Sequence, residues 1–221
     1  MRLLQCRIRC RPSTIVERRV ELDRFSWFQH GNPAAASIPA LLIALKACGV
    51  AREVQSGRKI HWDSARSGLG SAIRVANTLI SMYARCGSIV EAKRVFDGME
   101  APDTVSWNAL IQGYATSGED DQALQLFFQA RGSGLVDSRT HVFTLMACSA
   151  MAEKEEFTFI DGRFLKVKSL RLGLAVHSHA RDLGCDADIY VAGTLVDMYS
   201  KCGSMENAVS VFESMRTGNP R

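Results

Sequence analysis

The sequence predicts an all-α protein, an α-solenoid of about five helix-turn-helix repeats that form a right-handed superhelix. Residues 78–99 read TLISMYARCGSIVEAKRVFDGM and residues 194–215 read TLVDMYSKCGSMENAVSVFESM, and 11 of these 22 aligned residues are identical. A third copy, NALIQGYATSGEDDQALQLFFQA, starts at Asn108. Self-similarity with a period of roughly 30 to 35 residues is typical of stacked helical repeats. Proteins of this class bind along an extended surface made by several repeats.

Each copy contains two apolar-periodic segments on either side of a glycine, which is Gly87, Gly118 or Gly203. Apolar residues recur three and four positions apart within each segment, which puts them on one face of a helix. The pattern predicts helices over residues 77–86, 89–99, 108–117, 120–130, 194–202 and 205–215.

Two serines stand at the expected starts of second helices. Ser88 is followed three residues later by Glu91, which is the pattern of a capping box. Ser204 stands at the matching place in the last copy, where Asn207 replaces the glutamate. We therefore expect a full capping box at Ser88 and only its serine half at Ser204.

The copies divide residues 38–219 into five units, of which the fourth is too long. The units start at Ile38, Ile73, Thr104, Ser138 and Ile189. The fourth unit covers 51 residues, and its excess near residues 153–168, EKEEFTFIDGRFLKVK, is charged and not repeated. We expect this excess to loop out between two helices as an insertion.

The net charge of +4 lies entirely ahead of the repeats. Residues 1–37 contain seven arginines and three acidic residues, whereas residues 38–221 contain 20 basic and 20 acidic residues. The basic leader is compatible with an organelle transit peptide or with a disordered segment. The repeats lack the basic excess of a protein that binds any nucleic acid through its phosphates. Nucleic-acid binding would therefore need a local basic stripe or contacts to base edges.

No catalytic residue, metal site, cofactor or membrane span is predicted. The sequence has no CxxC pair, no phosphate-binding glycine motif, no nucleophile motif and no run of 18 apolar residues. Cysteines recur at matching positions, Cys48 with Cys148 and Cys86 with Cys202, which favours buried packing roles. Packing roles are also predicted for Tyr83, Tyr114, Tyr199 and Trp107.

The phrases MYARCGSIVEAKRVFDGM, VSWNALIQGYATSGEDDQALQLF and VDMYSKCGSMENAVSVF resemble plant pentatricopeptide repeats. The unit lengths resemble the PLS subclass of that family, in which standard (P), longer (L) and short (S) repeats alternate. By this resemblance the units are 38–72 (L), 73–103 (S), 104–137 (P), 138–188 (L, with the insertion) and 189–219 (S). Editing members of the family end in an E/DYW-type, deaminase-like domain with an H-x-E motif and a CxxC pair. Neither motif occurs here, so the resemblance is to a member that lacks this domain, or to a fragment of a longer protein.

The resemblance implies sequence-specific binding of single-stranded RNA in mitochondria or chloroplasts, with one base read by each repeat. In the family, one residue of the first helix and the last residue of the repeat select the base. These roles fall on Asn77 with Asp103 and on Asn108 with Asp137. Asn beside Asp is the family combination that prefers a pyrimidine, uridine above cytidine, whereas Thr with a terminal Asp or Asn reads purines. Asn offers a donor and an acceptor to a base edge, and Asp can orient its amide.

The same two positions are degenerate in the other units. Gly193, paired with Asn219, has no side chain with which to bond a base, so this unit should discriminate poorly. The L-like units, which generally read weakly in the family, have Leu42 with Ala72 and Val142 with Asp188. A purely structural role also stays open for the four candidate readers, since Asn favours helix starts and Asp favours turns.

Three interpretations of function follow. The first is an organellar RNA-binding protein that supports RNA modification, such as C-to-U editing, or RNA processing, with editing or processing proteins supplied in trans. The second is a helical-repeat scaffold that grips a partner peptide. The third is a non-functional gene fragment, because the sequence stops where another repeat should begin. The Asn and Asp pairs favour the first interpretation, and the near-neutral repeats keep the second open.

Overall fold

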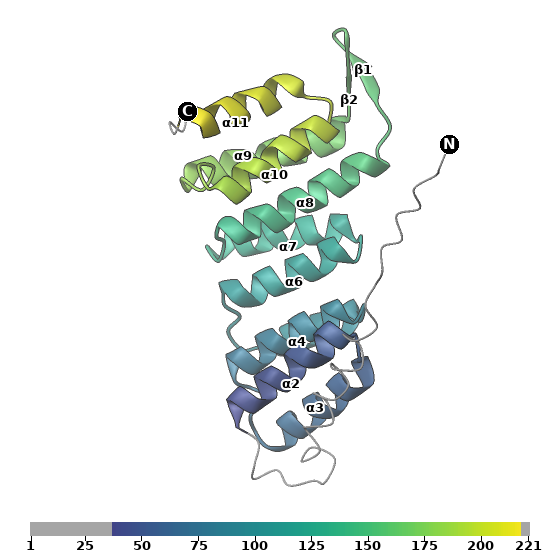
Figure 1. Cartoon of the computed structure of the whole chain (residues 1–221), viewed down its shortest axis with the longest axis vertical. Coiled ribbons are helices and arrows are strands. Elements are labelled where there is room, and N and C mark those ends of the chain that lie inside the picture. Colours follow the sequence, from purple (N-terminus) through teal and green to yellow (C-terminus); the bar gives the residue numbers. More distant parts are fainter. Residues whose placement is uncertain (1–36, 218–221) are drawn as a thin grey trace, which may run out of the picture.

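The computed structural model describes residues 37–217, where ten helices stack as five pairs (Figure 1). The first helices of the pairs are α2 (Ile38–Ala51), α4 (Ile73–Arg85), α6 (Thr104–Thr116), α8 (Ser138–Lys154) and α10 (Ile189–Lys201). The second helices are α3 (Val54–Arg66), α5 (Ile89–Asp97), α7 (Asp120–Gly132), α9 (Val167–Asp182) and α11 (Met205–Thr217). The predicted all-α solenoid is confirmed. The leader up to residue 36 and Asn219 lie outside the described residues.

The helices form two layers. Each first helix contacts the first helix of the next pair, so that α2, α4, α6, α8 and α10 follow one another in what we call the first-helix layer (Figure 1). Each second helix packs against the first helix of its own pair, and α3, α5, α7 and α9 also touch the first helix of the next pair. Every pair therefore buries its apolar face on a neighbour, which an isolated pair cannot do.

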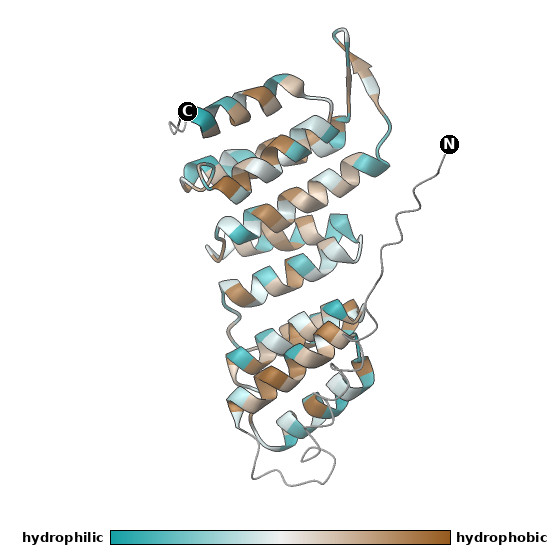
Figure 2. Ribbon diagram, viewed as in Figure 1, coloured by the Kyte–Doolittle hydropathy of each residue, from teal (hydrophilic) through white to brown (hydrophobic). Residues whose placement is uncertain are grey.

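A single apolar core runs through the stack. Hydrophobic residues recur along the helices that face the viewer in Figure 2, and three equivalent leucines are completely buried: Leu79, Leu110 and Leu195. Trp107 meets the ring of Phe96 edge to face, with 4.7 Å between the ring centroids. This contact joins α5 to α6 and confirms Trp107 as a packing residue between repeats. None of the helices between residues 37 and 217 has both the length and the apolar character to cross a bilayer.

The other recurring residues also pack as predicted. Tyr83 and Tyr199 are buried, and Tyr114 is half-buried against the core. Cys48, Cys148 and Cys202 are fully buried, whereas Cys86 is half-buried. Burial raises the pKa of the Cys148 thiol to about 12, so it stays protonated at neutral pH.

Glycines end the first helices of three pairs. Gly87, Gly118 and Gly203 have φ angles of 74°, 79° and 82°, a left-handed conformation that other residues adopt only with strain. The glycine recognised in each sequence copy therefore makes the turn from the first helix to the second.

The capping box predicted at Ser88 is wrong. Ser88 precedes α5, but its side chain accepts no capping hydrogen bond, and Glu91 pairs instead with Arg58 of α3 at 2.5 Å. At the matching place in the last pair, the side chain of Asn207 donates to the hydroxyl of Ser204 at 2.8 Å. Capping boxes occur instead at the starts of the first helices α6 and α8.

Between α8 and α9 the chain forms an antiparallel hairpin of strands β1 (Thr158–Ile160) and β2 (Arg163–Leu165). Asp161 and Gly162 connect the strands with φ angles of 49° and 79°, the positive values that two-residue hairpin turns require. The hairpin projects beyond the helix stack (Figure 1). Its two phenylalanines, Phe159 and Phe164, contact each other but remain about two-thirds exposed.

The base of the hairpin touches the next helix pair. The backbone N–H of Lys166 donates to the carbonyl of Cys202 at 3.1 Å. Arg163 forms two hydrogen bonds with the carboxylate of Glu206 in α11, at 2.6 and 2.8 Å. The excess of the fourth unit is thus in contact with the turn between α10 and α11 rather than surrounded by solvent.

Candidate functional site

Asn77 and Asp103 lie together at the joint between α4 and α6. Asp103 immediately precedes α6 and caps it, because its carboxylate accepts a hydrogen bond from the backbone N–H of Ser106 at 2.8 Å. Asn77, in the first turns of α4, donates from Nδ2 to Oδ1 of Asp103 at 3.1 Å. The hydroxyl of Ser106 lies 2.6 Å from Oδ1 of Asn77. Stacking of the two first helices thus brings the predicted pair into direct contact.

Asn108 and Asp137 repeat this arrangement at the joint between α6 and α8. Asp137 caps α8 by accepting from the backbone N–H of Thr140 at 3.0 Å. Nδ2 of Asn108 donates to Oδ1 of Asp137 at 3.0 Å, and the hydroxyl of Thr140 lies 2.6 Å from Oδ1 of Asn108. Two successive joints therefore hold the same triad of Asn, Asp and a hydroxyl residue.

Hydrogen bonds hold the two carboxylates in their charged form. Burial alone would raise the pKa of Asp103, but donors from the backbone and hydroxyl of Ser106 and from the amide of Asn77 outweigh it and lower that pKa. The pKa of Asp137 is lowered in the same way, against burial, by donors from Thr140 and Asn108. Both carboxylates are ionised at neutral pH and accept only.

The L-like units place no such pair at their joints. Leu42 is buried and Val142 half-buried, and neither side chain has a hydrogen-bonding group. Ala72 precedes α4 without any side-chain cap. Asp188 also caps α10, by accepting from the backbone N–H groups of Tyr190 and Val191, but the matching first-helix position of its unit is a valine instead of an asparagine.

In the last unit, the first-helix position that matches Asn77 and Asn108 is a glycine and has no side chain. Gly193 is exposed on α10, and a β-carbon added there would meet no atom within 4 Å. Asn219, its predicted partner, lies outside the described residues. The geometry around Gly193 therefore has room for a larger side chain but offers no contact of its own.

Beside the Asn77–Asp103 pair, the first-helix layer has a row of exposed and half-buried side chains. In α4 the row is Arg74, Thr78, Ser81 and Arg85, which are spaced along one helix face. Asn77 lies at the edge of this row, next to Arg74 and Thr78. A ligand that reached the Asn77–Asp103 pair from solvent would therefore lie along this row.

Cations outnumber anions on the first helices. Their two acidic residues, Glu153 and Asp197, both pair with Lys201, at 2.8 and 3.1 Å. Four exposed cations on these helices form no ion pair with any residue between 37 and 217: Lys46, Arg74, Arg85 and Arg139. These four side chains give α2, α4 and α8 of this layer positive charge that no acidic residue between 37 and 217 neutralises in an ion pair.

A groove of about 730 Å³ crosses the first-helix layer over α2, α4 and α6. Arg52 and Arg85 supply its charge, and Gln112 and Thr116 supply further polar groups. It continues the exposed row of α4 onto the two neighbouring helices.

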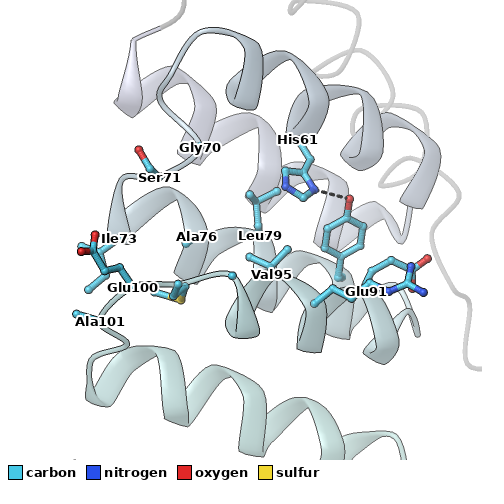
Figure 3. Close-up of a pocket in the computed structure, with 14 residues that line it drawn as sticks. His61, Gly70, Ser71, Ile73, Ala76, Leu79, Glu91, Val95, Glu100 and Ala101 are labelled. Atoms are coloured by element: carbon cyan, nitrogen blue, oxygen red, sulfur yellow. Dashed lines mark hydrogen bonds between the residues drawn. The ribbon is translucent and has the colours of Figure 1, made fainter.

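A second cavity of about 860 Å³ lies between α3, α4 and α5 (Figure 3). His61 projects into it and bonds the hydroxyl of Tyr83 at 3.0 Å, while Leu79 and Val95 form an apolar wall. None of the four predicted reader residues lines this cavity. It is a separate feature from the two triads.

A family model described as PPR repeat matches residues 75–101, 105–135 and 190–219. The chain is a pentatricopeptide repeat protein. The three matched ranges contain the α4–α5, α6–α7 and α10–α11 pairs, apart from a few residues at their ends.

Curated pentatricopeptide repeat proteins of Arabidopsis thaliana are similar to most of this chain. One is 33% identical over 79% of the chain, and a second, named chloroplastic, is 34% identical over 83%. A third, named mitochondrial, is 33% identical over 77%. The chain spans only 26%, 28% and 15% of the lengths of these relatives.

Among solved structures, the chain is similar to the crystal structure of the pentatricopeptide repeat protein PPR10 from maize. The match covers 94% of this chain and 32% of the maize chain, with 19% sequence identity and a TM-score of 0.45.

Two members of these triads, Ser106 and Thr140, are not among the site residues that the sequence predicts. Both are completely buried and are the third residues of their first helices. A signal was present, because each follows its aspartate by three residues, the spacing of a helix cap and its reciprocal partner.

Proposed function

We propose that this pentatricopeptide repeat protein binds single-stranded RNA and that the Asn77–Asp103 and Asn108–Asp137 pairs each read one base. The observation that carries the proposal is the repetition of one hydrogen-bonded arrangement at two successive joints, with Asn to Asp distances of 3.1 and 3.0 Å. A helix cap needs only the aspartate, so capping alone does not account for the asparagine at both joints.

The chemistry of each pair suits a base edge. An asparagine amide has two N–H bonds, and its aspartate takes one of them, which leaves a donor. Asn77 and Asn108 are 8% and 7% exposed, so little of either residue is accessible to a ligand. A pyrimidine, with its carbonyl acceptors, would meet that donor. The exposed cations on the first-helix layer would balance the phosphates that connect the bases.

We further propose that the RNA is organellar and that the protein supports RNA modification, such as C-to-U editing, or RNA processing. The chloroplastic and mitochondrial relatives support an organellar location. Proteins acting in trans would supply the chemistry. Within this chain, two readers limit affinity, since a good base contact discriminates by about 1–3 kcal/mol.

The test changes the code and keeps the fold. Asn108→Thr should move the preference at one base from pyrimidine towards purine, by the family combination described above. Fluorescence anisotropy with the full chain, at low salt, would compare short RNAs that differ at that one base. Gln125→Thr, at an exposed position on α7, the second helix of the same pair, is the control and should leave the preference unchanged.

Two results would count against the proposal. Identical base preferences in wild type and Asn108→Thr would overturn the assignment of readers. Absence of any RNA binding would overturn the function itself and favour a peptide-binding scaffold, for which the cavity beside His61 would be the first place to look.

A further inference from the structure

The hydroxyl at the third position of a first helix is placed to act on the reader of the preceding repeat. Ser106 Oγ lies 2.6 Å from Asn77 Oδ1, and Thr140 Oγ1 lies 2.6 Å from Asn108 Oδ1. Each hydroxyl also accepts from the backbone N–H of its own aspartate, at 3.1 Å for Asp103 and 2.9 Å for Asp137. The hydroxyl therefore touches both members of the pair.

Donor and acceptor counting decides where the hydroxyl proton lies. A hydroxyl has one proton, and the carboxylate oxygen and the asparagine oxygen both compete for it. In both triads the asparagine oxygen is nearer, at 2.6 Å, than the carboxylate oxygen, at 2.9 Å in one triad and 3.0 Å in the other. The proton therefore lies mainly on the bond to the asparagine, and the carboxylate oxygen is its second, more distant acceptor.

The two bonds together leave one orientation for the amide. The carboxylate can only accept, so the NH₂ group of the asparagine must face it, and the hydroxyl then holds the carbonyl oxygen on the opposite side. A flipped amide would set its oxygen against the carboxylate, lose the hydrogen bond to the aspartate and no longer accept from the hydroxyl. The group left for a ligand is the second N–H.

The hydroxyl accompanies the reader pair within this chain. The third residue is Ser106 in α6 and Thr140 in α8, the two first helices that follow an Asn–Asp pair. In the other first helices it is Ala40, Val75 or Val191. Asp188 caps α10 without a hydroxyl partner, so the cap itself does not require one.

We propose that Ser106 and Thr140 are specificity-determining positioning residues, which fix the amide orientation of Asn77 and Asn108 and so make each repeat present a donor to its base. This inference rests on the proposed RNA-binding function. It extends the base-selecting unit from two residues to three, the third of which belongs to the next repeat.

The test removes the hydroxyl and keeps the shape of the side chain. Thr140→Val should reduce the preference for pyrimidine over purine at the base opposite Asn108 by about two- to tenfold, the range for one neutral hydrogen bond. Thr140→Ser should retain the preference. Thr144→Val is the matched control, because its buried hydroxyl in the same helix bonds only the carbonyl of Thr140.

Base preference separates positioning from stability. A hydroxyl that serves only the helix cap would, when lost, lower stability and weaken all RNAs equally. An unchanged preference in Thr140→Val, in a protein whose wild type does discriminate, would overturn the inference and leave the proposed function intact.

A measurement without RNA covers the case in which the proposed function fails. In ¹⁵N-labelled wild type, the side-chain amide proton of Asn108 that bonds Asp137 should exchange slowly with solvent, because the hydroxyl of Thr140 keeps the amide from turning away. Thr140→Val should speed that exchange at least severalfold, whereas Thr144→Val should not. Equal exchange rates in all three proteins would show that the hydroxyl does not hold the amide.

Discussion

At the scale of single residues, the aspartates have two tasks at once. Asp103 and Asp137 cap the first helix of one repeat and anchor an asparagine of the preceding repeat. The structural and the functional interpretations of these residues are therefore compatible. An aspartate that is fixed by its own helix cap can hold a reader amide without being free to move.

Removing the hydrogen bond that Asn108 donates should change the pKa of Asp137. Asn108→Leu removes a hydrogen bond to the charged carboxylate, so the pKa of Asp137 should rise. Side-chain carboxyl NMR across an acid titration would measure this. Asn77→Leu should raise the pKa of Asp103 and leave that of Asp137 unchanged.

The sign of the stability change follows from the same shift. The folded-state pKa of Asp137 is depressed, so its bonds stabilise the fold above the ordinary aspartate pKa of about 3.9 and are lost as pH falls through the folded value. Asn108→Leu should therefore make unfolding less dependent on pH in the acid range. An Asp137 pKa that does not move would mean that the 3.0 Å contact is not an effective hydrogen bond.

At the scale of elements, the hairpin between α8 and α9 is both a projection and a contact. Its tip is exposed, but the carbonyl of Phe164 lies so close to Gly203 that a β-carbon there would collide with it. Its ion pair with Glu206 is exposed and adds little. The backbone contact at Gly203 is thus the part of the hairpin most sensitive to substitution.

Alanine substitutions at the equivalent glycines Gly87 and Gly203 distinguish the cost of losing this contact from the cost of backbone strain. Gly87→Ala should cost about 1–2 kcal/mol, because its φ is positive and nothing lies within 4 Å of the new β-carbon. Gly203→Ala should cost clearly more, because it also collides with the hairpin. Urea unfolding monitored by circular dichroism would measure both.

Shortening the hairpin gives the decisive comparison. Replacing residues 158–165 with a short Gly-Ser link should leave helical content nearly unchanged and reduce the cost of Gly203→Ala to that of Gly87→Ala. If Gly203→Ala lowers the free energy of unfolding by the same amount without the hairpin, the base of the hairpin does not restrict the α10–α11 turn.

At the scale of the whole molecule, each pair is stabilised by the pair that follows it. Phe96 and Phe212 occupy equivalent places in their repeats, but Phe96 is 7% exposed against Trp107, whereas Phe212 is 53% exposed on α11. The same residue type therefore contributes differently according to its neighbour in the stack.

Truncating these two phenylalanines should measure that difference. Phe96→Ala should destabilise the protein by about 3–5 kcal/mol, the usual cost of removing a buried aromatic ring. Phe212→Ala should cost much less, since half of its ring already meets solvent. Equal losses in chemical denaturation would contradict the stacking account.

The sequence alone determined the helical stack. Apolar residues three and four apart, with a glycine at the end of each first helix, allow little besides helix pairs, and a period near that of one pair implies stacking. A hairpin signal is also present in the sequence, because Asp161–Gly162 stands between two β-prone triplets, but the charged residues around it favour a loop. The capping box at Ser88 failed because Glu91 has a stronger partner in Arg58, on a different repeat.

Only the tertiary structure decided how the candidate readers are held. Asn77 and Asp103 are 26 residues apart, and Asn108 and Asp137 are 29 apart, so no local pattern shows that they bond. The third member of each triad was hidden for the same reason, since its hydroxyl looks like half of a helix cap until the preceding repeat is stacked against it. Local periodicity is encoded within a helix, whereas these contacts form across a joint, where the packing of one first helix on the next sets which side chains meet.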